Sequence, residues 1–118
     1  MSRDDPRSHL PLTPIVLHIL IALGDGERHG YAIAQEIEQE FYGVRVGPGT
    51  MYGSIQRMLA AKLIEEVHPK SRGDADSRRR YYRATALGKK VKHAELERLE
   101  TLLQFAREGR TVRRPGLA

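Results

Sequence analysis

The sequence of 118 residues contains no cysteine and no long hydrophobic run. The absence of cysteine excludes disulfides, thiolate metal sites, iron–sulfur clusters and a cysteine nucleophile. The longest apolar stretch, Ile15 to Leu23, is interrupted by His18 and is far shorter than the roughly 20 residues of a membrane-spanning helix. The first nine residues lack the apolar segment of a secretory signal peptide. We therefore expect a soluble, cytoplasmic protein without a membrane partner.

Recognisable catalytic and cofactor motifs are missing as well. The glycine-rich stretch from Gly47 to Gly53 has Tyr52 where a dinucleotide-binding fingerprint needs its third glycine, and no Gly-Lys-Ser/Thr follows for a P-loop. The five histidines show no pair at the spacing of a helical metal site. Only Tyr81 and Tyr82 fall in a predicted strand, which is little for the stacking platform of an RNA-binding sheet. We expect no enzymatic activity, no cofactor and no bound metal.

The chain has an excess of basic residues. Its 20 Lys and Arg exceed its 15 Asp and Glu, which gives a net charge of +5 and a pI of about 9.8. A chain of about 100–200 residues is typical of a single domain, so one small domain carries this charge. The total charge alone is weak evidence for an anionic partner. The location of the basic residues along the chain is the stronger evidence.

The hydrophobic pattern predicts four helices and one hairpin. Capping residues and apolar periodicity favour helices over residues 14–23, 31–41, 48–61 and 86–108. The pattern changes to that of strands over residues 63–68 and 78–85, with a polar loop between them. The predicted fold is mainly α with a two-stranded β-hairpin, a winged helix-turn-helix followed by a C-terminal dimerisation helix. We expect a flexible N-terminus (1–11), a DNA-binding domain (12–85), a dimerisation helix (86–108) and a disordered basic tail (109–118).

The predicted helix over residues 48–61, the reader helix, is the candidate for contact with DNA bases. Opposite its apolar face it is low in charge, and Gly53 and Ala60 are small enough to let the helix axis approach the floor of a major groove. The side chains that can bond base edges or phosphates are Thr50, Ser54, Gln56 and Arg57. Thr50 lies in the first turn, where the helix dipole favours a phosphate. An ordinary amphipathic helix with a solvated polar face remains the alternative.

The hairpin, which we call the wing, concentrates the positive charge. Between Pro69 and Arg80, five bases and two acids give a net charge of +3. The bases are Lys70, Arg72, Arg78, Arg79 and Arg80. Arginines at the root of a loop suit contact with phosphates beside the groove, and a solvated charge run is the alternative. The predicted second helix is acidic, and we expect its charged face to point away from DNA.

The predicted last helix carries two apolar stripes. One can pack on the first helix, and a chain of this length has no element left to cover the other unless both fit one broad monomer core. Exposed leucines are costly, so we expect the same helix of a second subunit to cover the stripe. The expected contacts are Leu96, Leu99, Leu102, Leu103 and Ala106. A twofold homodimer would place two reader helices on successive major grooves of a near-palindromic operator in double-stranded DNA.

Short motifs stand in a fixed order along these elements. They are His29-Gly30-Tyr31, Gly49-Thr50-Met51-Tyr52, Leu63-Ile64-Glu65 and Arg80-Tyr81-Tyr82-Arg83, followed by Thr85 and Gly88. Together they resemble the PadR-like family of transcriptional regulators over about residues 12–103, in its smaller branch with a single C-terminal helix. Two positions depart from the family pattern: Lys62 stands where glycine is frequent, and Gly53 where proline is frequent.

The resemblance implies a winged-helix dimer that usually represses promoters and is released by a small-molecule effector. It implies DNA contact by Thr50, Tyr52 and Arg57 and by the arginines of the wing. Some small members stack flat drugs on a tryptophan, a mode that does not carry over because this chain has none. Tyr31 and Tyr82 are predicted to be core aromatics. The alternative function is a protein-interaction winged-helix module without specific DNA binding.

Overall fold

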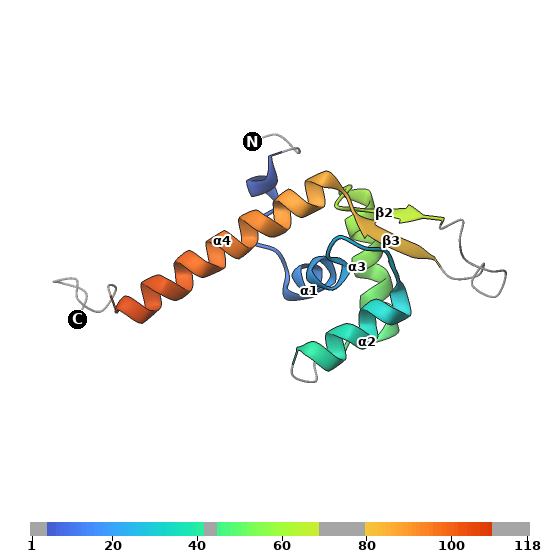
Figure 1. Ribbon diagram of the computed structural model, residues 1–118, viewed down its shortest axis with the longest axis horizontal. Helices are drawn as coiled ribbons and strands as arrows, with labels where there is room; N and C mark the ends of the chain where they lie inside the picture. The colour runs from blue at the N-terminus through green and yellow to red at the C-terminus, as the bar shows by residue number, and fades with distance from the viewer. Residues whose placement is uncertain (1–4, 42–44, 69–79, 110–118) are drawn as a thin grey trace.

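The computed structural model describes residues 5–41, 45–68 and 80–109. In this part of the chain there are four α-helices and a small antiparallel sheet, which lies at the end of the molecule opposite the C-terminal end of α4 (Figure 1). The elements in chain order are η1 (Pro6–His9, a 3-10 helix), α1 (Pro14–Leu23), β1 (Arg28–His29), α2 (Gly30–Glu40), α3 (Pro48–Ala60), β2 (Ile64–Val67), β3 (Tyr81–Ala84) and α4 (Ala86–Glu108). The mainly helical winged-helix fold is confirmed.

The helix ends follow from the residues that cap them. The His29 ring nitrogen Nδ1 accepts a hydrogen bond from the Ala32 N–H at 3.1 Å and so caps α2. The Thr85 hydroxyl accepts one from the Gly88 N–H at 3.0 Å and caps α4. Gly109 ends α4 in the left-handed conformation, with φ of +65°, which glycine adopts without steric cost. The bounds of α2 and α4 lie within one residue of the helices predicted over 31–41 and 86–108.

The sheet has three strands in the order β1-β3-β2, where the sequence predicted only two. On the unforeseen edge of β3, Arg28 pairs with Tyr82 and His29 with Tyr81. A strand of two residues offers no alternating pattern, which explains why it was missed. The predicted strand over 78–85 is observed from Tyr81, and residues 69–79 lie outside the described residues.

The core lies where α1, α2, α3, the sheet and the first half of α4 meet. Its fully buried apolar side chains, with at most 1% exposed, are Ile19, Leu20, Ile33, Ile37, Met58 and Val91. Burying each contributes about 1.5–3 kcal/mol. His18 of α1 stacks on Phe41 with ring centroids 4.4 Å apart, so this histidine is packed against the second helix's C-terminal end.

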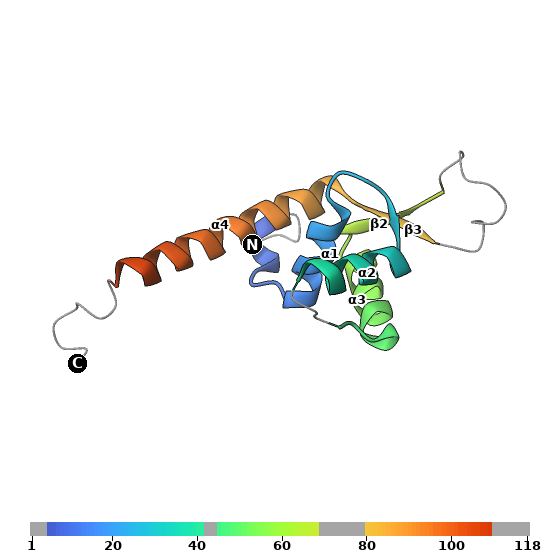
Figure 2. The ribbon, with the colours of Figure 1, turned by 60° about the horizontal axis from the view of Figure 1, so that its bottom comes forward.

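The second half of α4 extends beyond the rest of the molecule in both views (Figures 1 and 2). Val91, near its start, is fully buried, whereas Leu102 and Leu103 are 57% and 50% exposed. The stripe predicted to pack on the first helix therefore does so only in its first half. Within the described ranges, no helix is both long enough and apolar enough to cross a membrane.

Candidate nucleic-acid interface

Helix α3 turns one face to the core and the other to solvent. Met51, Ile55 and Met58 are buried, and the exposed positions include Gly49, Thr50, Tyr52, Gln56, Arg57 and Ala60. At 100° per residue, the small residues and Gln56 occupy the centre of the exposed face, with Tyr52 on one flank and with Thr50 and Arg57 on the other. This face carries no acidic side chain, because α3 contains none.

Ser54 is not part of this exposed face, and its predicted place there was wrong. Its side chain is fully buried. At 100° per residue it lies within about 60° of both Met51 and Met58, which places it on the apolar side of the helix. A buried hydroxyl needs a hydrogen-bond partner, and the Arg57 Nη2 group donates to the Ser54 Oγ at 3.2 Å. Ser54 therefore holds the Arg57 side chain from the buried side of the helix.

At the base of the wing, Arg80 lies beside β3. Its side chain is 68% exposed, and its Nη1 atom is 4.0 Å from the Glu66 Oε2. An exposed pair at this distance contributes little to stability, so the guanidinium remains available to an anion. The other predicted cations of the wing lie outside the described residues: Lys70, Arg72, Arg78 and Arg79.

Tyr31 is exposed, which corrects the prediction that it is a core aromatic. It is 68% exposed at the start of α2, and its ring lies parallel to that of His29 with centroids 6.5 Å apart. The helical spacing could have shown this, because Tyr31 lies about 160° around the helix from the buried Ile33. Tyr82 is buried as predicted, and burial raises the pKa of its phenol.

A groove of about 590 Å³ runs between α2, α3 and the start of β3. Tyr31, Tyr52 and Arg80 line it, so side chains from three elements share one surface. Glu38 lines it as well, and its Oε1 pairs with the Arg45 Nε at 3.5 Å. Glu38 belongs to the acidic face of the second helix, for which an orientation away from DNA stays a prediction.

The predicted dimerisation residues lie on the uncovered half of α4. Leu96 is 41% exposed, Leu102 and Leu103 are about half exposed, Leu99 is half-buried and Ala106 is exposed. These side chains leave an apolar stripe in contact with water. As for metal binding, His, Asp and Glu side chains form no group of three among the described residues that could hold an ion.

Comparison with known proteins identifies the family of this chain. Residues 16–94 match the model of the transcriptional regulator PadR-like family. Transcriptional regulator Rv3488 of Mycobacterium tuberculosis is 37% identical over 86 residues, which cover 73% of this chain and 76% of that protein. An uncharacterized 37.1 kDa protein in transposon TN4556 of Streptomyces fradiae is 46% identical over 54 residues, and the match spans only 15% of its length.

Solved structures with a similar fold include members of the same family. The complex hsRosR-S4, of the RosR protein of H. salinarum, is similar with a TM-score of 0.69 and 31% identity, over 86% of this chain and 81% of that one. A PadR family transcription regulator from Clostridium difficile shares the fold with a TM-score of 0.65 at 24% identity, over 78% of this chain and 95% of that one. The chain belongs to the PadR-like family of transcriptional regulators.

Proposed function

We propose that this regulator is a homodimeric repressor that binds a near-palindromic operator in double-stranded DNA and is released by a small-molecule effector. The observation that carries the proposal is the exposed face of α3, which lacks acidic side chains and lies beside Tyr31 and Arg80. A helix with small residues at the centre of its outer face fits a major groove about 12 Å wide.

Each side chain of this surface has a role that its chemistry allows. The amide of Gln56 reads a base edge, since Gln makes paired hydrogen bonds with adenine. Arg57, held by Ser54, bonds a guanine or a phosphate. Thr50 and the first N–H groups of α3 bind a phosphate, as do the hydroxyl of Tyr52 and the guanidinium of Arg80.

The apolar stripe on α4 supplies the dimer contact. Leucines that are about half exposed gain about 25 cal/mol for every Å² that a partner removes from water. To reach successive major grooves, a twofold axis through the stripe has to place the two α3 helices about 34–36 Å apart, one turn of DNA.

Binding to the DNA upstream of the protein's own gene tests the proposal. In a gel-shift assay we expect a shifted band that competitor DNA of unrelated sequence does not remove. We also expect log K to fall linearly with log salt, with a slope of about −0.9 for each phosphate contact. No shift at low salt, with a stable protein complex recovered instead, would support a protein-interaction module. A reporter gene downstream of the bound site shows whether the regulator represses or activates, and compounds that restore the reporter identify effectors.

A further inference from the structure

Hydrogen bonds attach helix α4 to the body of the molecule at two of the places where they meet, and the Lys89 Nζ pairs with the Asp25 Oδ1 between them at 3.3 Å. The first is its N-terminus, where the Thr85 hydroxyl donates to the Lys62 carbonyl at 2.6 Å and the Thr85 N–H donates to the Leu63 carbonyl at 3.0 Å. The second lies ten residues further along, at Glu95. Beyond Glu95 the helix loses its cover and carries the exposed leucines. Glu95 thus marks the border between the packed half of α4 and the proposed dimer half.

Glu95 is a charged side chain in the interior, only 1% exposed. Its Oε2 accepts a hydrogen bond from the backbone N–H of Leu12 at 2.7 Å. The Arg98 guanidinium donates through Nε to Oε1 and, at 3.2 Å, through Nη2 to Oε2. The hydrogen bond from Arg98 holds the pKa of the Glu95 carboxyl below its ordinary value, so the group is an ionised and fully bonded carboxylate.

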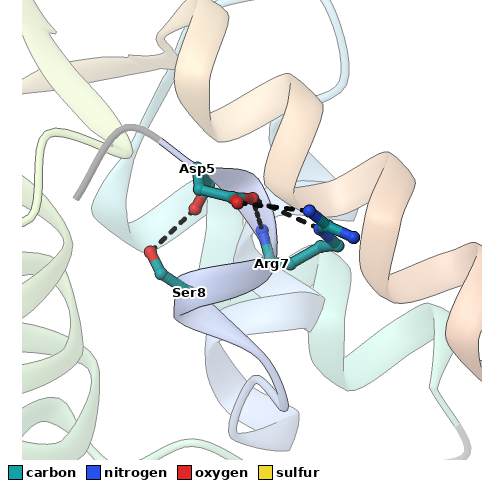
Figure 3. A network of polar contacts seen from close by, with 3 residues as sticks. All are labelled: Asp5, Arg7 and Ser8. Carbon is teal, nitrogen blue, oxygen red and sulfur yellow. Dashed lines mark hydrogen bonds and ion pairs between the residues drawn. The ribbon is translucent and has the colours of Figure 1, made fainter. Parts of the chain in front are cut away.

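The hydrogen bond from the Leu12 N–H connects Glu95 to α1, the helix that packs against the reader helix α3. Leu12 directly precedes Thr13, the N-cap of α1, and α1 packs against both α3 and α4. The short helix η1 that leads into this segment also packs against α4. Asp5 caps η1 by accepting the Arg7 N–H at 2.9 Å, and the Ser8 hydroxyl donates to the Asp5 carbonyl at 2.7 Å (Figure 3).

We propose that Glu95 is a positioning residue that fixes the angle between α4 and the winged-helix body, and thereby sets which half-site spacing the dimer binds. The inference rests on the proposed function. From Glu95 to Glu108 the helix extends for about 20 Å at 1.5 Å per residue, so a tilt of about 10° displaces its end by about 3.5 Å. This displacement is close to the rise of one base pair, about 3.4 Å. In a twofold dimer the same angular error arises in both protomers, so a tilt of this size at Glu95 changes the separation of the reader helices on the scale of base-pair steps.

The first experiment measures the dimer without DNA. Because the chain has no cysteine, Ala60→Cys creates a single attachment point for a spin label on the exposed face of α3. Double electron–electron resonance between the two labels then measures the separation of the two α3 helices. We expect one narrow distribution in the parent protein, and a shift or broadening of about 3 Å or more in Glu95→Ala. Glu95→Gln keeps an acceptor for the Leu12 N–H, so it should restore much of the narrow distribution.

The second experiment measures affinity for duplexes whose two half-sites are separated by a varied number of base pairs. The parent dimer should prefer one spacing about tenfold over its neighbours, and Glu95→Ala should lose most of this preference while affinity for an isolated half-site stays unchanged. Glu97→Gln is the matched control, because it removes an exposed carboxylate two residues away that pairs with His93 in its own helix, at 3.0 Å.

The outcomes separate the inference from the function on which it rests. If the parent is a monomer or binds no duplex, the proposed function fails and the inference with it. If the parent dimer binds DNA, but Glu95→Ala matches Glu97→Gln in both the label distance and the spacing preference, only the inference is overturned. Should Glu95→Ala fail to fold, Arg98→Gln weakens the same cluster from its exposed side, and an unchanged distance and spacing preference there would likewise refute the role of Glu95.

Discussion

Gly88, in the first turn of α4, lies so close to the Leu63 carbonyl group that a β-carbon on residue 88 would overlap the Leu63 oxygen. This approach lets α4 start directly on the connector between α3 and β2. The obstructing atom belongs to the backbone, and the same carbonyl accepts the Thr85 N–H at 3.0 Å. Neither Gly88 nor the Leu63 carbonyl can move aside without breaking the hydrogen bond that connects the start of α4 to the residues before β2.

Gly88→Ala is expected to destabilise the fold severely, by about 3 kcal/mol or more, because the overlap forces the backbone apart. Urea unfolding monitored by circular dichroism measures the loss. Gly49→Ala is the matched control: its new β-carbon would meet nothing within 4 Å, and alanine favours the helix by up to about 1 kcal/mol. A midpoint for Gly88→Ala equal to that of the control would refute the steric argument.

Lys62→Gly is expected to stabilise the protein. Lys62 has φ of +61°, in the left-handed region that costs a residue with a β-carbon about 1–2 kcal/mol. The greater freedom of glycine in the unfolded chain offsets part of this cost, so we expect a gain of about 0.5–1 kcal/mol in the free energy of unfolding. Lys62→Ala removes the exposed side chain but keeps the β-carbon, and it should show no such gain. Equal stability of the two variants would contradict the prediction.

Glu95 should make stability depend on pH in the acid range. Hydrogen bonding to Arg98 lowers the pKa of Glu95 in the folded state relative to the unfolded chain, where a glutamate titrates near 4.3. Its contribution is therefore complete above that value and is lost as pH falls through the lowered folded-state pKa. We expect the stability difference between the parent and Glu95→Gln to be largest near neutral pH and to shrink in strong acid. A difference that is constant with pH in urea titrations would rule out this account.

Base-reading and phosphate-binding side chains should differ in the kind of loss that they cause. Gln56→Ala is expected to weaken operator binding by about 5–150-fold and to relax the preference at one base pair, with little effect on unrelated DNA. Arg80→Ala should weaken binding to all sequences alike and reduce the slope of log K against log salt by about 0.9. Fluorescence anisotropy over a salt series with operator and unrelated duplexes distinguishes the two. If both variants show the same change in sequence preference and in salt dependence, the distinction between a base-reading Gln56 and a phosphate-binding Arg80 is wrong.

Leu103→Glu is expected to dissociate the dimer, because it places a charge in the middle of the apolar stripe of α4. Sedimentation velocity should show the mass of one chain at concentrations where the parent shows two. Thr101→Glu is the control: Thr101 is exposed and lies about 160° around the helix from Leu103. The dimer model predicts that this charge leaves the mass unchanged. A parent of single-chain mass, or a Leu103→Glu variant that stays dimeric, would locate the interface elsewhere.

Features that depend on local chemistry were predictable from the sequence. The histidine and threonine caps of α2 and α4, and the glycine that ends α4, each act on backbone groups a few residues away. The apolar and exposed faces of α3 followed from the helical period, apart from Ser54. That error, and the one at Tyr31, came from weighing residue type above angular position on the helix.

Features that join distant segments were not predictable. Glu95 stands among several charged residues of α4, and its burial depends on the backbone of Leu12, 83 residues earlier. The strand β1 exists only because β3 offers it a pairing edge. In both cases the partner is set by the tertiary fold, and no pattern in the segment itself reveals it.

The central place of β3 in the sheet has a consequence for the thermodynamics of recognition. Because His29 pairs with β3 on one side and also caps α2, while β2 pairs on the other side, the base of the wing and the helix-turn-helix form one hydrogen-bonded unit. If the proposed function is correct, Arg80 and α3 would meet DNA in a relative orientation that already exists before binding. Contact by Arg80 after docking of α3 would then require little further loss of rotational and translational entropy, so the two proposed contacts would reinforce each other.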